Sequence, residues 1–218
     1  MIEGVIFDLD GVLVTTDDCH YEAWKRMADE EGMPFDREVN RRLRGVSRME
    51  SLDIILENAG RVYSGEERTA LAKRKNAYYV DMIHGLGKDA ILSGALETLE
   101  KLRRLGIKLA IGSSSKNAPA ILDRLGLAGY FDTVADGNQI HRSKPDPDVF
   151  LLAANKLGLQ PANCLVVEDA DAGVEAAVRA GMRVLAVGAA KGNPRATVQA
   201  ESLGTFDLSA YLSGENRA

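Results

Sequence analysis

Short apolar segments alternate with amphipathic helical segments over most of the chain, and this alternation constrains the fold more than any other feature. The apolar segments, rich in Val, Ile and Leu, are 4–7, 108–113, 133–136, 164–169 and 183–188. The segments with helical spacing are 96–106, 118–127, 147–158 and 172–181. Strands that are apolar on both faces are typical of parallel sheets covered by helices. The sequence therefore predicts an α/β fold with a doubly wound, Rossmann-like parallel sheet.

Residues 15–88 interrupt this alternation, because one helix signal follows another there without any strand signal. Two capping boxes mark helix starts in this segment, pairing Ser47 with Glu50 and Ser64 with Glu67. We therefore predict a small helical domain over 15–88, inserted directly after the first strand. The core domain would then consist of 1–14 and 89–218. The last residues, GENRA, are expected to form a frayed tail.

Composition narrows the classes of partner and compartment. A net charge of -5 argues against a nucleic-acid or membrane surface. No apolar run approaches the ~20 residues that span a bilayer, and the first strand begins almost at Met1, which leaves no room for a signal peptide. Cys19 and Cys164 lack metal-ligand spacing and are expected to be reduced thiols. We expect a cytoplasmic protein and, because no heptad repeat is sustained, a monomer.

Polar residues follow the predicted strands at the points where ligands gather in doubly wound sheets. These residues are Asp8 and Asp10, Ser113 to Asn117, Lys144, and the pair Glu168 and Asp169. Crowded carboxylates repel one another unless a cation lies among them, and oxygen ligands of this kind favour Mg²⁺. A carboxylate can attack phosphorus while a second acid moves a proton and a lysine neutralises charge. The pattern indicates phosphoryl transfer, although each acidic pair taken alone could simply cap a turn or a helix.

The same residues lie in segments that resemble, in order, the motifs of the haloacid dehalogenase superfamily of phosphotransferases. The segments are DLDGV, SSSKN, KPDPDVF and VVEDADAG, and the resemblance runs from Val5 to about Gly188. It implies that the helical insert is a mobile cap. Within the superfamily, the sequence is most similar to the β-phosphoglucomutases, which interconvert β-glucose 1-phosphate and glucose 6-phosphate through a 1,6-bisphosphate.

This resemblance implies roles for residues of the core. Asp8 would be the phosphorylated nucleophile and Asp10 the general acid and base. Ser113 and Lys144 would hold the transferring phosphoryl group. Mg²⁺ would bind Asp8, the backbone carbonyl of Asp10, and Asp169, with Glu168 assisting directly or through water.

The resemblance also implies a second phosphate site, shared between the cap and the core. Arg48, in the segment LRGVSRMESL, would grip the non-reacting phosphate, although it lies in a capping box and could be an ordinary solvated charge. Lys75 would link cap to core, although its run of charges could face water. His20 resembles a hinge histidine that helps to hold Asp10. The remaining residues implied to contact substrate are Thr16, Gly45, Ser115, Lys116 and Asn117.

Two positions depart from the family pattern. Thr15 stands before Thr16 where an acidic residue is common, and Ala170 follows the acidic pair where Ser is frequent. Neither change removes a group that the chemistry requires. The expected activity is Mg²⁺-dependent interconversion of sugar phosphates. The alternatives are a sugar-phosphate phosphatase that uses the same Asp8, and a non-catalytic sensor of phosphorylated ligands.

Overall fold

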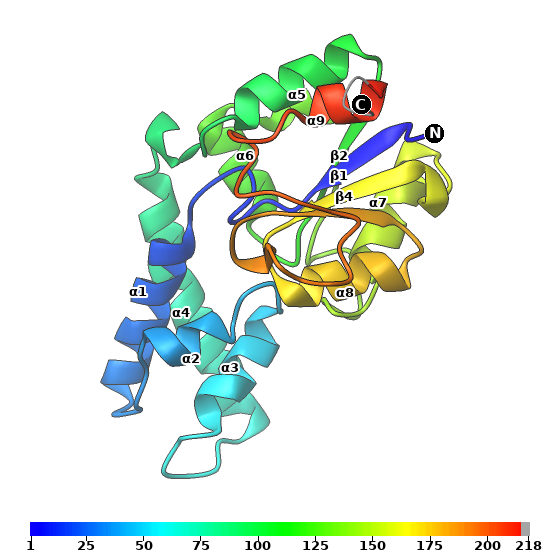
Figure 1. Cartoon of the computed structure of the whole chain (residues 1–218). Helices are drawn as coiled ribbons and strands as arrows, with labels where there is room; N and C mark the ends of the chain where they lie inside the picture. The colour runs from blue at the N-terminus through cyan, green and yellow to red at the C-terminus, as the bar shows by residue number, and fades with distance from the viewer. Residues whose placement is uncertain (215–218) are drawn as a thin grey trace.

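A parallel six-stranded sheet forms the centre of the protein, in the strand order β3-β2-β1-β4-β5-β6 (Figure 1). The computed structural model describes residues 1–214, so the predicted frayed tail falls almost entirely outside the described residues. The strands are β1 (Gly4–Phe7), β2 (Lys108–Gly112), β3 (Thr133–Ala135), β4 (Cys164–Glu168), β5 (Arg183–Ala186) and β6 (Val198–Gln199). The predicted doubly wound α/β fold is confirmed.

Helices cover both faces of this sheet because successive strand residues point to opposite sides. In β1, Val5 and Phe7 contribute to one hydrophobic cluster and Ile6 to the other. The first cluster includes side chains of α5 (Ala95–Arg104), α6 (Ala118–Leu125) and α9 (Leu208–Ser213). The second includes side chains of α7 (Asp148–Leu157) and α8 (Asp171–Arg179), on the opposite side of the sheet in Figure 1.

Two short elements were not predicted from the sequence. Strand β6 has two residues and pairs with β5, with Leu185 opposite Val198, and α9 has six residues. Segments this short carry no measurable periodicity, so only pairing and packing with distant parts of the chain define them. None of the helices within residues 1–214 is long and apolar enough to cross a membrane.

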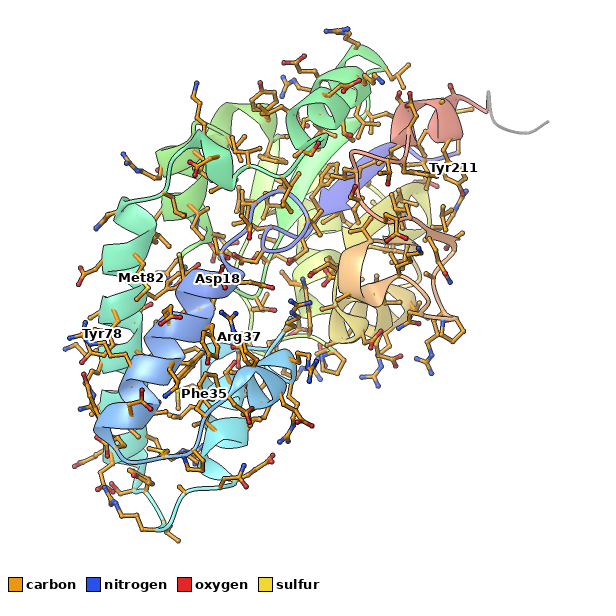
Figure 2. All side chains as sticks on the ribbon, turned by 60° about the vertical axis from the view of Figure 1, so that its left-hand side comes forward. Asp18, Phe35, Arg37, Tyr78, Met82 and Tyr211 are labelled. Carbon is orange, nitrogen blue, oxygen red and sulfur yellow. The ribbon has the colours of Figure 1, made fainter. Side chains whose placement is uncertain are left out.

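The segment that follows β1 folds into helices with a hydrophobic cluster of their own. These helices are α1 (Asp17–Glu30), α2 (Arg37–Arg41), α3 (Arg48–Leu56) and α4 (Gly65–His84). Both predicted capping boxes form, at Ser47 and Ser64. Figure 2 labels Asp18 and Arg37, whose ion pair of 2.9 Å links α1 to the start of α2. We call this segment the cap; its boundaries as a separate domain remain a prediction.

Candidate active site

A cavity of about 640 Å³ lies between the cap and the carboxyl ends of the strands. Most of the residues predicted from the sequence line it: Asp8, Asp10, His20, Gly45, Arg48, Lys75, Ser113, Ser115, Lys116, Asn117 and Asp169. Three other predicted residues, Thr16, Lys144 and Glu168, are buried instead of lining the cavity. The sheet and the cap thus bring the predicted residues to one place.

The chain turns sharply after β1, and this turn positions both aspartates. The backbone N–H of Asp8 donates to the carbonyl of Val167 at 2.9 Å, which ties the nucleophile candidate to β4. Gly11 follows with φ of +82°, a backbone conformation that residues with a Cβ rarely adopt. A Cβ at this position would lie 2.2 Å from Oδ2 of Asp169. Glycine here therefore allows the first acidic pair to approach the second closely.

Lys144 lies between the carboxylates of Asp8 and Glu168. We call these two acids, together with Asp169, the acidic floor of the cavity. Nζ of Lys144 donates to Oδ1 of Asp8 at 2.5 Å and to Oε2 of Glu168 at 3.0 Å, and its side chain is completely buried. Burial alone would lower the pKa of this ammonium, but Asp8 and Glu168 raise the pKa above its ordinary value. Lys144 is therefore a permanent positive charge beside Asp8, as a group that stabilises a phosphoryl transfer requires.

Three buried carboxylates meet at this floor and could hold a metal ion. Ligand oxygens of Asp8, Glu168 and Asp169 all lie within 4.8 Å of one another. Burial and the charge of Asp8 raise the pKa of Asp169 to about 7, and burial raises the pKa of Glu168 well above its usual range despite Lys144. One lysine does not balance three acids, and the all-oxygen donor set fits Mg²⁺. These residues therefore fit the magnesium ion that the sequence predicted.

Asp10 has the properties of a proton carrier near neutral pH. Burial and the neighbouring charge of Asp8 raise its pKa to about 7. The hydroxyl of Thr16 donates a hydrogen bond to Oδ1 of Asp10, which favours the charged form and limits this rise. Thr16 is buried and contacts Asp10, so its predicted contact with substrate remains a prediction.

The loop after β2 presents hydroxyl and amide groups to the cavity. The Oγ of Ser113 accepts the backbone N–H of Ser115 at 3.1 Å, and the Oγ of Ser115 accepts that of Asn117 at 3.2 Å. Because both hydroxyl oxygens act as acceptors in these bonds, their own hydrogens remain available for an anion. Ser114 donates to the carbonyl oxygen of Gly45 at 3.1 Å, so this loop also contacts the cap.

The half-buried His20 and the buried Lys75 form a pair in the cap. Nζ of Lys75 lies 3.0 Å from Nδ1 of His20, and the ring of Tyr79 packs against the imidazole in a tilted arrangement, with centroids 4.1 Å apart and 32° between the ring planes. Burial and the charge of Arg48 lower the pKa of Lys75 to about 7, and burial with Lys75 lowers the pKa of His20. Within the described residues the side-chain hydrogen-bond partner of Asp10 is Thr16, so the direct support of Asp10 by His20 remains a prediction.

The burial of Lys75 could have been recognised in the sequence. The buried residues of α4 include Leu71, Lys75, Tyr79 and Ile83, which recur every four residues, and Ala72 beside them. Lys75 interrupts an apolar stripe at this spacing, and a charge inside such a stripe is a sign of function. The neighbouring charges of Lys73 and Arg74 instead suggested a solvent-exposed segment.

Arg48 and Asn117 meet at a residue that the sequence analysis did not identify. The side-chain oxygen of Asn76 accepts from Nη2 of Arg48 at 2.6 Å and from Nδ2 of Asn117 at 3.0 Å. Asn76 comes from α4, whereas Arg48 begins α3 and Asn117 precedes α6 in the core. Its position next to Lys75 is the only trace of this role in the sequence.

Comparisons with known proteins agree with this geometry. A family model of haloacid dehalogenase-like hydrolases matches residues 2–181. The β-phosphoglucomutase of Bacillus subtilis (strain 168) is 41% identical over 98% of this chain and 95% of its own. A phosphorylated carbohydrates phosphatase of Thermotoga maritima is 35% identical, with 83% and 82% of the two chains covered. The crystal structure of a β-phosphoglucomutase from Clostridium difficile superposes with a TM-score of 0.93, at 38% identity over 100% of this chain and 98% of the other.

Proposed function

The chain belongs to the haloacid dehalogenase-like hydrolase family, and from this premise we propose that it interconverts β-D-glucose 1-phosphate and glucose 6-phosphate. The phosphoryl group would pass through an aspartyl-phosphate on Asp8 and a sugar 1,6-bisphosphate. This activity belongs to the isomerase class, because the product has the same atoms as the substrate. The β-phosphoglucomutase relatives described above support this assignment.

One observation carries the proposal: a single cavity contains both a phosphoryl-transfer centre and a second group of phosphate donors. Asp8 and Asp10 line it together with Arg48 and Asn117. A phosphatase needs the transfer centre alone. A mutase also needs donors for the phosphate that does not react, since its bisphosphate must bind in two orientations. Arg48, a half-buried guanidinium, suits a dianionic phosphate.

Asp8 and Asp10 divide the chemistry between them in this proposal. The free C6 hydroxyl of β-glucose 1-phosphate attacks the phosphorus on phosphorylated Asp8, the bond from Asp8 to phosphorus breaks, and the hydroxyl proton moves to Asp10, which gives the 1,6-bisphosphate. After the bisphosphate binds in the other orientation, an oxygen of Asp8 attacks the phosphorus at C1, the bond from phosphorus to the C1 oxygen breaks, and Asp10 gives that oxygen a proton. A pKa of about 7 lets Asp10 play both parts near neutral pH.

Lys144 and Ser113 stabilise the charge on the transferring group. Lys144 contacts Asp8 directly, and the hydroxyl of Ser113 is free to donate to a phosphoryl oxygen. A magnesium ion would be held by Asp8, Asp169, Glu168 and the backbone carbonyl of Asp10. When bound, it would neutralise negative charge on the phosphoryl oxygens.

A sugar-phosphate phosphatase is the second candidate, and the relative from Thermotoga maritima favours it. The transfer centre would be the same, but water would take the phosphoryl group from Asp8. Exclusion of water by the cap decides between the two outcomes. The contact between Ser114 and Gly45 shows where cap and core meet beside the cavity.

Incubation with β-glucose 1-phosphate, Mg²⁺ and a trace of glucose 1,6-bisphosphate tests the proposal. The expected product is glucose 6-phosphate, with little free phosphate and no activity in the Asp8→Asn variant. Release of free phosphate without glucose 6-phosphate would instead establish the phosphatase. Stoichiometric binding of a sugar phosphate without any turnover would indicate a sensor.

The cellular setting of this enzyme belongs to the proposal as well. We infer a small sugar phosphate as the substrate, a monomeric enzyme, and a cytoplasmic location without nucleic-acid or membrane partners. The net charge of -5 supports the absence of a nucleic-acid partner.

A further inference from the structure

Arg48 comes from the cap and Asn117 from the core, and the two share one acceptor. Nη2 of Arg48 lies 2.6 Å from the side-chain oxygen of Asn76, and Nδ2 of Asn117 lies 3.0 Å from the same oxygen. An amide oxygen has two lone pairs and can accept both bonds. The two donors therefore converge on one point although they belong to the cap and to the core.

The charge of Arg48 has no counterion at this point. Within residues 1–214 the structure pairs Arg48 with no carboxylate, whereas the neighbouring cavity residue Arg44 is neutralised by Asp17 at 2.5 Å. Arg48 is half-buried, and burial lowers the pKa of its guanidinium. A partly desolvated cation on a neutral partner gains much when a dianion replaces that partner.

We propose that Asn76 is a positioning residue for the second phosphate, because its side-chain oxygen holds Arg48 and Asn117 together where a phosphate oxygen binds. This inference rests on the proposed mutase function, which requires such a phosphate. Asn76 aligns the donors before substrate arrives and so lowers the cost of ordering them. Since the amide is neutral, the phosphate displaces it from Arg48 without breaking an ion pair.

The neutrality of Asn76 provides the test. In the Asn76→Asp variant a carboxylate of nearly the same shape would pair with Arg48 and repel the phosphate. We expect the KM for β-glucose 1-phosphate to rise about 10- to 100-fold, as loss of a charge-assisted hydrogen bond implies. Asn76→Ala removes the acceptor without adding charge, and its KM should rise about 3- to 10-fold. In both variants kcat should fall much less than kcat/KM, because the lost interaction is binding rather than chemistry.

Two controls accompany these variants. One is a substrate without a second phosphate, acetyl phosphate, and the other is a charge added at Asn40. Acetyl phosphate has no second phosphate, so for Asn76→Asp the loss in kcat/KM for its hydrolysis should be at least about tenfold smaller than that for β-glucose 1-phosphate, and for Asn76→Ala it should be close to none. Asn40 also lines the cavity and makes no side-chain hydrogen bond to Arg48 or Asn117. The Asn40→Asp variant adds the same charge to the same cavity, and its KM should change about threefold at most because this charge has no hydrogen bond to Arg48 to replace and is screened by water and salt.

The outcomes separate this inference from the mutase proposal. If the wild-type enzyme makes no glucose 6-phosphate, the mutase function and the second-phosphate role of Asn76 both fail. If the wild type is a mutase and Asn76→Asp keeps its KM, only the role of Asn76 fails. Equal losses on both substrates, an equal effect of Asn40→Asp, or a lower KM in Asn76→Ala would also overturn it. Unfolding temperatures of all variants, expected to agree within a few degrees, exclude a general loss of structure.

Discussion

Lys144 and Asp8 meet in the buried floor of the cavity, with 2.5 Å between Nζ and Oδ1, although 136 residues separate them in the sequence. Glu168 contacts the same ammonium at 3.0 Å. This arrangement places one fixed positive charge among three acids.

Replacing Lys144 should remove the only buried counter-charge that the structure gives this acidic floor within residues 1–214. For Lys144→Met we expect the free energy of unfolding at neutral pH to fall by about 3–5 kcal/mol, the usual cost of breaking a buried ion pair. Turnover should be lost as well. Denaturant unfolding measures the effect, and Lys156→Met, on the exposed surface, is the matched control. A loss that is equally large for both variants would contradict the special role of Lys144.

Asp10 should make a pH-dependent contribution to stability. Its pKa is raised from 3.8 to about 7 in the folded protein, so between these values the folded state binds more protons than the unfolded state. The contribution of Asp10 is then fully present below about pH 4 and is lost as pH rises through about 7. The difference in unfolding free energy between wild type and Asp10→Asn, without magnesium, should therefore shift against the wild type by about 1–3 kcal/mol over this range. A difference that stays constant with pH would show that Asp10 has an ordinary pKa.

Thr16 should hold the pKa of Asp10 below the value that burial alone would give. Its hydroxyl donates to Oδ1 of Asp10 and lowers the pKa of that carboxyl, so Thr16→Val should raise the pKa by about one unit. The pH profile of kcat/KM for β-glucose 1-phosphate measures this shift. Thr16→Ser keeps the donor and should leave the profile in place. A profile that moves equally in both variants would point to altered packing.

Magnesium removal should expose the repulsion among the acids. Asp8, Glu168 and Asp169 lie within 4.8 Å and are only partly balanced by Lys144. Magnesium at about 1 mM, which is about 100 times the expected dissociation constant, should stabilise the protein at pH 7. The free energy of unfolding should then be about 3 kcal/mol higher than that of chelator-treated protein. The gain should be smaller at pH 5, where protons compete for the carboxylates. Asp169→Asn should abolish most of it, and an unchanged gain in this variant would place the ion elsewhere.

Gly45 should control how closely the cap approaches the core. It has φ of +76°, and a Cβ there would lie 3.1 Å from the Cβ of Ala170. Gly45→Ala should therefore hold the cap away and admit water. The ratio of glucose 6-phosphate to free phosphate should fall about fivefold or more, since overpacking costs about 1–3 kcal/mol.

Two further variants isolate this contact. Gly32 has φ of +68° with no atom within 4 Å of a Cβ, so Gly32→Ala reproduces the backbone strain without the collision. It should lower stability and leave the product ratio as it is. Adding Ala170→Gly to Gly45→Ala should restore part of the ratio. A product ratio that falls equally with Gly32→Ala would attribute the effect to strain alone.

The residues of the acidic floor could be predicted because they lie at the ends of neighbouring strands. Asp8 directly follows the first apolar strand, Glu168 ends the fourth and Asp169 follows it, in line with the sequence analysis. In the sheet, β1 and β4 are parallel neighbours, with Phe7 opposite Val167. Parallel neighbours end at the same edge, so acids placed after each strand meet without any further information. The resemblance to a known family added the roles of these residues.

The contacts above this floor could not be predicted in the same way. The partner of Arg48 is Asn76, from another helix of the cap, and the partner of Asn76 in the core is Asn117. Helices pack through side chains that are distant in sequence, and no short repeat records which polar groups meet when two packed layers face each other. Likewise, β6 exists only because β5 is there to pair with it.

The sequence by itself determined the alternating strands and helices, the parallel sheet, and the acids and lysine at its edge, because hydrophobic periodicity and strand polarity are local properties of the chain. Only the tertiary structure decided that Thr16 holds Asp10, that His20 is the partner of Lys75, and that Asn76 joins Arg48 to Asn117. Each of these pairs depends on how the cap packs on itself and on the core. That packing is set by contacts summed over the whole molecule.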